Sequence, residues 1–158
     1  MAAWWTNTGG AWRGALMDLF VYGTLMVAEV MHRVCGHTGR PQSAVLRDYR
    51  RWRLRGEVYP AIVPDVRGQV EGLLHRGLQP AQIAALDAFE GDFYRRMAVE
   101  VQVGARSCPA ETYVLDPAFT HLLSTEEWSL QAFAERAKGR FLTDYAGFRA
   151  ISVDDERH

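Results

Sequence analysis

The 158-residue chain has few of the features that mark a disulfide framework, a metal site or a membrane anchor. Its two cysteines, Cys35 and Cys108, show no CxxC or Cys/His spacing, so we expect two reduced thiols. The five histidines are scattered without an HxxxH or HExxH pattern, which gives no set of metal ligands. No apolar run approaches the roughly 18 residues of a membrane span, and we predict no membrane partner.

Charge of one sign is also lacking. Eighteen basic and nineteen acidic residues leave a formal charge of -1, which argues against a broad surface for nucleic acid or anionic lipid. A charged ligand would have to be recognised locally, and we expect a small-molecule partner.

The length suits one globular domain, since domains cluster at roughly 100 to 150 residues. We predict a single domain over 18–150, a flexible extension over 1–17 and a tail over 151–158. The extension is loosened by glycines and has no basic region followed by an apolar core, so it is no secretory signal. We expect a cytoplasmic protein.

The hydrophobic pattern predicts strands first, with helices inserted later. Residues 19–22 form a short apolar run that ends at Gly23, typical of a buried strand leading into a tight turn, and residues 26–34 have helical spacing. Further strands are expected at the following ranges: 43–54, 59–63, 69–74, 97–103 and 112–115. A turn through Pro64, Asp65 and Gly68 would separate the second and third of these.

Two more helices complete the pattern. Pro80 begins a helix that ends near Phe89, before Gly91, and a last helix is expected from Thr125 to about Tyr145. The order favours an α+β fold with a mixed sheet, curled into a small β-barrel with flanking helices, and it does not match a Rossmann pattern.

Arginines alternate with apolar residues in the strand at 43–54, so Arg51, Arg53 and Arg55 share one face. Such a face contacts RNA in some barrels. Without exposed aromatics between the arginines it is more typical of a solvated face.

Glu90 is the residue that most suggests chemistry. It follows Ile83 and Leu86 at i+7 and i+4, so a carboxylate lies on the apolar stripe at the end of a helix. Burial there would raise its pKa towards the range useful for proton transfer. The alternative is that Glu90 turns to solvent or pairs with Arg95 or Arg96, and Asp87, one turn earlier, is a possible second carboxylate.

The second candidate is the turn formed by Tyr22, Gly23, Thr24 and Leu25. A glycine where a strand meets a helix lets backbone N–H groups converge, and these can hold a carboxylate or an oxyanion. Many such turns bind nothing, so the pattern alone is weak evidence.

Four segments in this order resemble the gamma-glutamylcyclotransferase-like family, in its gamma-glutamylamine cyclotransferase and avirulence-induced branch. They are FVYGTL at 20–25, YPAIV at 59–63, VEGLL at 70–74 and LDAFEG at 86–91, followed by Tyr94, Arg95 and Arg96. The resemblance implies a small mixed β-barrel and a cofactor-independent release of 5-oxoproline from a gamma-glutamyl substrate. It implies that Glu90 is the catalytic acid/base, that residues 22–25 bind substrate, and that Tyr113 lines the pocket.

Two other functions stay open at this point. The same barrel is compatible with a non-catalytic protein that binds a small metabolite or a partner protein. The arginine strand leaves an RNA-binding barrel as a weaker third hypothesis.

Overall fold

The computed structural model describes residues 15–133 and 135. The predicted extension lies almost wholly outside the described residues, as do the tail and most of the last predicted helix, so the domain boundaries remain predictions.

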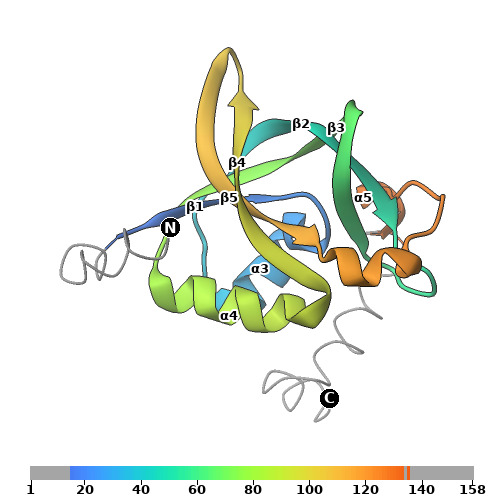
Figure 1. Ribbon diagram of the computed structural model, residues 1–158. Coiled ribbons are helices and arrows are strands. Elements are labelled where there is room, and N and C mark those ends of the chain that lie inside the picture. The colour runs from blue at the N-terminus through green and yellow to red at the C-terminus, as the bar shows by residue number, and fades with distance from the viewer. Residues whose placement is uncertain (1–14, 134, 136–158) are drawn as a thin grey trace, which may run out of the picture.

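Five strands close into a barrel in the order β1-β3-β2-β4-β5 (Figure 1). They are β1 (Met17–Val21), β2 (Gln42–Arg53), β3 (Pro60–Leu78), β4 (Tyr94–Val103) and β5 (Arg106–Leu115). All neighbours are antiparallel except β1 and β5, which pair in parallel at Leu19 and Glu111. The predicted α+β class with a small mixed barrel is therefore confirmed.

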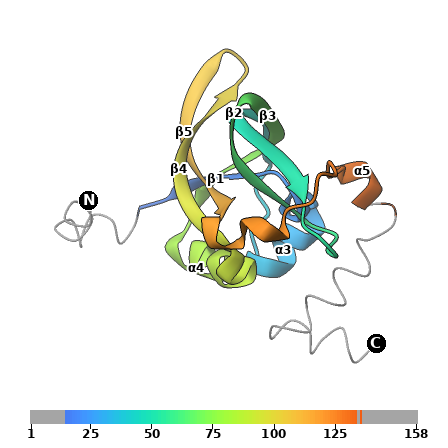
Figure 2. The same cartoon turned by 45° about the vertical axis from the view of Figure 1, so that its right-hand side comes forward.

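Short helices occupy the connections. The turn after β1 is the 3-10 helix η1 (Thr24–Met26), followed by α3 (Ala28–Cys35), while α4 (Pro80–Glu90) leads through η2 (Gly91–Phe93) into β4. Beyond β5 come η3 (Pro117–Leu122) and α5 (Leu130–Ala132). Figures 1 and 2 show α3 and α4 together at one end of the barrel, whereas the β4–β5 hairpin extends beyond the other.

The predicted turn between two strands at 59–63 and 69–74 is wrong, because β3 runs through it as one strand. Between the pairs Arg47–Gln69 and Tyr49–Pro64, β3 uses five steps where β2 uses two. The extra residues of β3 form a bulge opposite Asp48, which has a φ of 70°. Proline, aspartate and glycine thus mark a bulge, after which pairing resumes in the same direction.

Arg51 and Arg53 on β2 are partly exposed and Arg55, just after the strand, is exposed, and all three also hold other parts of the chain. Arg51 donates to the carbonyls of Tyr22 (2.6 Å) and Glu71 (3.1 Å). Arg53 bonds the Glu126 carboxylate (3.0 Å), and the Arg55 guanidinium donates to the Leu123 carbonyl (3.0 Å). These side chains bind other parts of the protein.

His75 is a buried polar group in β3. The residue is 4% exposed, and among the described residues its Nδ1 finds no hydrogen-bond partner. The ring of His37 meets it edge-on at 5.1 Å between centroids. Burial, with a smaller effect from His37, lowers the pKa of His75 to about 4.

This histidine should make the protein sensitive to mild acid. The unfolded chain takes up the proton near pH 6.5 but the folded chain only near pH 4, so stability is complete above pH 6.5 and falls as the pH drops towards 4. Between pH 7.5 and 5 the contribution of His75 should fall by about 2 kcal/mol. We expect His75→Leu to lose correspondingly less stability in urea unfolding over this range. The same substitution at the exposed His121 is the control, and equal losses in the two variants would contradict the prediction.

Candidate functional site

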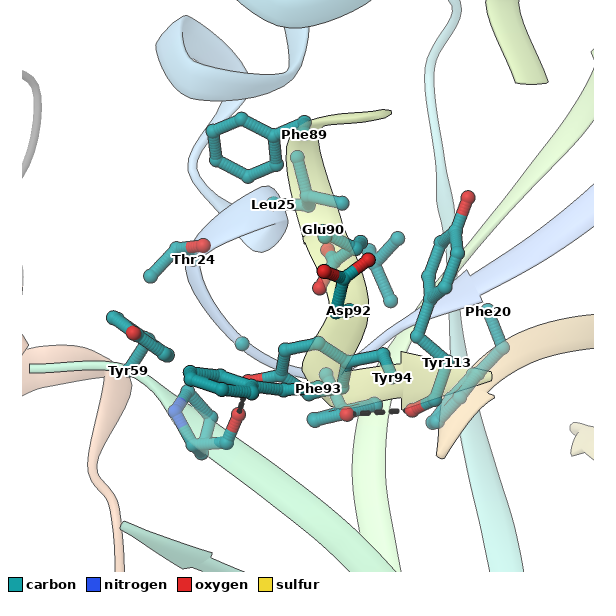
Figure 3. Close-up of a pocket in the computed structure, with 15 residues that line it drawn as sticks. Phe20, Thr24, Leu25, Tyr59, Phe89, Glu90, Asp92, Phe93, Tyr94 and Tyr113 are labelled. Carbon is teal, nitrogen blue, oxygen red and sulfur yellow. Dashed lines mark hydrogen bonds between the residues drawn. The ribbon is translucent and has the colours of Figure 1, made fainter. Parts of the chain in front are cut away.

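A cavity of about 250 Å³ opens where the end of β1 meets the end of α4 (Figure 3). It is lined by β1 and the turn after it, by the start of β3, by the α4–β4 junction and by one residue of β5: Phe20, Val21, Tyr22, Gly23, Thr24, Leu25, Tyr59, Pro60, Phe89, Glu90, Gly91, Asp92, Phe93, Tyr94 and Tyr113. The size suits a ligand of roughly amino-acid dimensions. The structure thus brings Glu90, the 22–25 turn and Tyr113 to one cavity.

Glu90 is the last residue of α4, and Ile83 and Leu86 on the same stripe are buried against the barrel. The side chain of Glu90 faces the cavity and is only partly exposed. Burial, with the negative charge of Asp87 as a second cause, raises the pKa of Glu90 to about 8. Within the described chain, no hydrogen bond or ion pair stabilises its charged form.

The alternative considered for Glu90, a pairing with Arg95 or Arg96, does not form. Arg95 lies 4.0 Å from the carboxylate of Asp116. Arg96 binds Asp87 through two hydrogen bonds, of 2.9 and 3.1 Å, and also contacts Glu111. The carboxylate of Glu90 is therefore left facing the cavity.

The turn at 22–25 is held from both sides. Met26 N–H donates to the Gly23 carbonyl (2.9 Å) and Val27 N–H to that of Thr24 (3.1 Å), which closes η1. The N–H groups of the first residues of η1 precede these bonded amides in the chain. The first N–H groups of a helix have no acceptor within the helix. Arg51 fixes the Tyr22 carbonyl just before the turn.

Gly23 is required by close packing. A Cβ at this position would lie 2.9 Å from Cγ and Cδ of Pro60, and a proline ring has little freedom to move away. Gly23 therefore lets the turn pass directly against the start of β3.

Two tyrosines that line the cavity join the turn after β1, β5 and α4. The Tyr22 hydroxyl donates to the Tyr113 carbonyl (2.6 Å), and the Tyr113 hydroxyl donates to Asp87 (2.7 Å). Burial, with the nearby Glu90 as the next cause, raises the pKa of Tyr22 above its usual value. Both tyrosines are therefore neutral hydrogen-bonding groups at ordinary pH.

Other parts of the site were missed at the sequence level. Tyr59, Phe93 and Tyr94 form an aromatic wall, and the Tyr94 hydroxyl donates to the Pro60 carbonyl (2.8 Å). Their places in the sequence were the available signal for a role in the site: Tyr59 begins the 59–63 segment, and Phe93 and Tyr94 follow Gly91. Arg51 could not be found this way, because its bond to Tyr22 depends on how β1 and β2 are placed.

Within residues 15–133 and 135, no three histidine, cysteine, aspartate or glutamate side chains are grouped as metal ligands. No helix of the described part of the chain combines the length and the apolar character needed to cross a membrane.

Comparison with known proteins identifies the family. Residues 19–130 match the family model described as "Gamma-glutamyl cyclotransferase, AIG2-like". AIG2-like protein C of Arabidopsis thaliana is 39% identical over 120 residues, which cover 72% of this chain and 70% of the relative. The chain therefore belongs to the AIG2-like gamma-glutamyl cyclotransferase family.

Solved structures agree on the fold. An Arabidopsis thaliana protein of known solution structure superposes with a TM-score of 0.61 at 29% identity, covering 84% of this chain and 90% of that one. A structure described as "Gamma-glutamyl cyclotransferase" has a TM-score of 0.56 at 17% identity, covering 63% and 66%, a similarity of fold alone.

The raised proton affinity of Glu90 can be measured without a substrate. A carboxyl that holds its proton to about pH 8 when folded, but to about 4.5 when unfolded, stabilises the fold fully below pH 4.5 and loses that contribution as the pH rises through 8. We expect Glu90→Gln to become more stable relative to wild type between pH 5 and 8, by about 3.5 kcal/mol in denaturant unfolding. The control is Glu29→Gln on α3. A constant difference for Glu90→Gln would mean that Glu90 titrates normally.

Proposed function

We propose that the protein is a cyclotransferase that acts on gamma-glutamyl amines or peptides and releases 5-oxoproline. The observation that carries the proposal is the shared cavity of Glu90 and the 22–25 turn, together with the pKa of about 8 of that carboxyl. A group with a pKa near neutrality is suited to both accept and return a proton. Family membership and fold support the same class of reaction.

The substrate carries its own nucleophile. Its α-amine can close onto its γ-carbonyl as a five-membered ring, so the protein must supply only orientation and proton transfer. The new bond joins the amine nitrogen to the γ-carbon, and the bond from that carbon to the leaving nitrogen breaks. Of the three ammonium protons one stays on the ring nitrogen, and two pass to the departing amine, which leaves as an ammonium ion.

Glu90 is placed to carry these protons. In the empty cavity at pH 7 about nine tenths of the molecules hold Glu90 protonated, given its pKa of about 8. An ammonium group that enters beside it favours the ionised form, because an opposite charge lowers the pKa of a carboxyl. Glu90 then accepts a proton as the amine attacks and donates it to the leaving nitrogen.

The turn at 22–25 has a complementary role in this proposal. Its N–H groups at the start of η1 would hold the substrate carboxylate or the oxyanion that develops on the γ-carbonyl. Tyr113 would form the wall next to the reacting atoms, because its ring lines the cavity while its hydroxyl is engaged with Asp87. None of these steps calls for a metal or an organic cofactor.

The direct test is Glu90→Gln. Glutamine keeps the shape and the hydrogen bonds of glutamate but cannot shuttle a proton, so 5-oxoproline release should fall 10²- to 10⁴-fold while ligand binding persists. The assay follows 5-oxoproline over a panel of gamma-glutamyl amines, gamma-glutamyl peptides and glutathione, with Glu29→Gln as the matched control. Wild-type protein that binds these compounds without forming 5-oxoproline would be a binding protein, and an active Glu90→Gln would make Glu90 structural.

A second test concerns the turn. Gly23→Ala places a methyl group 2.9 Å from Pro60, so the turn must shift away from its position beside Glu90. We expect the KM for a gamma-glutamyl amine to rise at least tenfold, with the barrel still folded by circular dichroism. Ala28→Ser, at the start of α3 and outside the cavity lining, is the control. Unchanged kinetics in a folded Gly23→Ala would exclude the turn from substrate binding.

A further inference from the structure

A cluster of charges is centred one helical turn before Glu90. The guanidinium of Arg96, on β4, bridges two carboxylates: Asp87 on α4, at 2.9 and 3.1 Å, and Glu111 on β5. The hydroxyl of Tyr113, also on β5, donates to the same Asp87 oxygen that accepts from Arg96 Nε. Asp87 is therefore held by three hydrogen bonds from two strands.

This cluster is connected to the cavity at two points. Asp87 lies one helical turn before Glu90, and residues three apart on a helix are surface neighbours at about 5–6 Å between Cβ atoms. Tyr113 lines the cavity with its ring and reaches Asp87 with its hydroxyl. Neither Asp87 nor Arg96 lines the cavity.

The titratable groups on the elements around Glu90 give the electrostatic background. Asp87 and Glu111, both bound by Arg96, leave this cluster with one net negative charge when both are ionised. The other groups are Asp92 on η2, Tyr22 at the end of β1, Arg51 on β2, and the tyrosines that line the cavity or its wall: Tyr59, Tyr94 and Tyr113.

We propose that Asp87 and Arg96 are a positioning pair for Glu90: Asp87 keeps a negative charge at a fixed place one turn away, and Arg96 limits how strongly that charge acts. Neither residue touches substrate in this arrangement. The kinetic test of this inference rests on the proposed function, whereas the titration of Glu90 followed by NMR does not. The proposal predicts that removing the two partners moves the titration of Glu90 in opposite directions.

Asp87→Asn removes the charge with little change of shape. The amide oxygen still accepts from Tyr113, whereas the negative neighbour of Glu90 is gone and Arg96 is less neutralised. The titration midpoint of Glu90 should fall by about one pH unit, and the acid limb of kcat/KM should fall with it.

Arg96→Gln has the opposite effect. Asp87 and Glu111 lose their shared cation, so more negative charge acts on Glu90 and both its midpoint and the acid limb should move to higher pH. Arg96→Lys keeps a positive charge without the two-pronged contact. It should leave the midpoint close to wild type while kcat falls, which separates charge from geometry.

The direct readout is carbon-13 NMR of glutamate carboxyl groups, with the Glu90 signal assigned by its loss in Glu90→Gln. Asp65→Asn, which breaks the ion pair of Asp65 with Arg50 away from the cavity, is the matched control and should leave the midpoint unchanged. Thermal melting establishes that each variant is folded. Because Arg96→Gln and Asp87→Asn are read separately, either of them decides if it is folded.

The outcomes are distinct. Opposite shifts of the Glu90 midpoint in Asp87→Asn and Arg96→Gln support the proposal, and a midpoint that stays within 0.2 units in folded Asp87→Asn or folded Arg96→Gln overturns it. If wild-type protein forms no 5-oxoproline, the proposed function fails, yet the NMR midpoints still decide this inference. If turnover is present and the midpoints do not move, the pair is structural and the proposed function stands.

Discussion

Closure of the barrel through β1 is the constraint on which the site depends. This five-residue strand pairs antiparallel with β3 and in parallel with β5. Side chains of β1 and of Tyr22 just after it alternate between two cores: Leu19 and Val21 pack towards the helices, and Phe20 and Tyr22 towards the barrel interior. A Cβ at Gly72 of β3 would lie 2.3 Å from the Val21 carbonyl oxygen, so only glycine lets β1 lie this close. Since the 22–25 turn follows directly, its place beside α4 is fixed by this closure.

The sequence predicted the parts of the fold that depend on local periodicity. The run at 19–22, the helix from Pro80 and the inward stripe of α4 follow from spacings of two and of three to four residues, and all three are present. The continuity of β3 was not predictable, because a bulge and a turn share the same residue types. Only the partner strand distinguishes them, and its register is set by the whole barrel.

The charged side chains show the same limit. The position of Glu90 on the stripe could be predicted, but the partner of Arg96 could not. The sequence offers several carboxylates and does not show which of them lie near the guanidinium after folding. Arg96 binds Asp87 and Glu111 because the fold places β5 beside β4 and α4 at the barrel end. Likewise Arg51 finds the Tyr22 carbonyl only because the folded barrel brings β2 to it.

The energetics of Glu90 favour a functional reading of the cavity. At neutral pH, a glutamate whose pKa is raised to about 8 stabilises the fold less than a neutral residue of the same shape would. A purely structural position would accommodate glutamine or an aliphatic side chain at least as well. Strongly perturbed carboxyls in cavities are enriched at sites that move protons, which fits the proposed reaction.

Under the proposed function, Glu90 and the 22–25 turn are complementary to the α-ammonium and the α-carboxylate of a gamma-glutamyl group. Of the described residues that line the cavity, the charged side chains are the carboxylates Glu90 and Asp92, with no lysine, arginine or histidine. Under the proposed function, the α-ammonium of a gamma-glutamyl group would meet Glu90, while its α-carboxylate would meet the uncharged donors of the 22–25 turn. In the occupied cavity, Glu90 ionised beside an ammonium and Glu90 protonated beside a neutral amine carry the same net charge, because the two states differ only in which group holds the proton. The proton needed to start ring closure therefore moves between two groups already in contact, without exchange with solvent.

A strongly acidic carboxyl would hold the ammonium as a stable ion pair and oppose the attack, whereas a carboxyl of raised proton affinity releases the amine as a nucleophile. The burial that weakens the fold at Glu90 is, in this mechanism, what makes proton transfer nearly balanced.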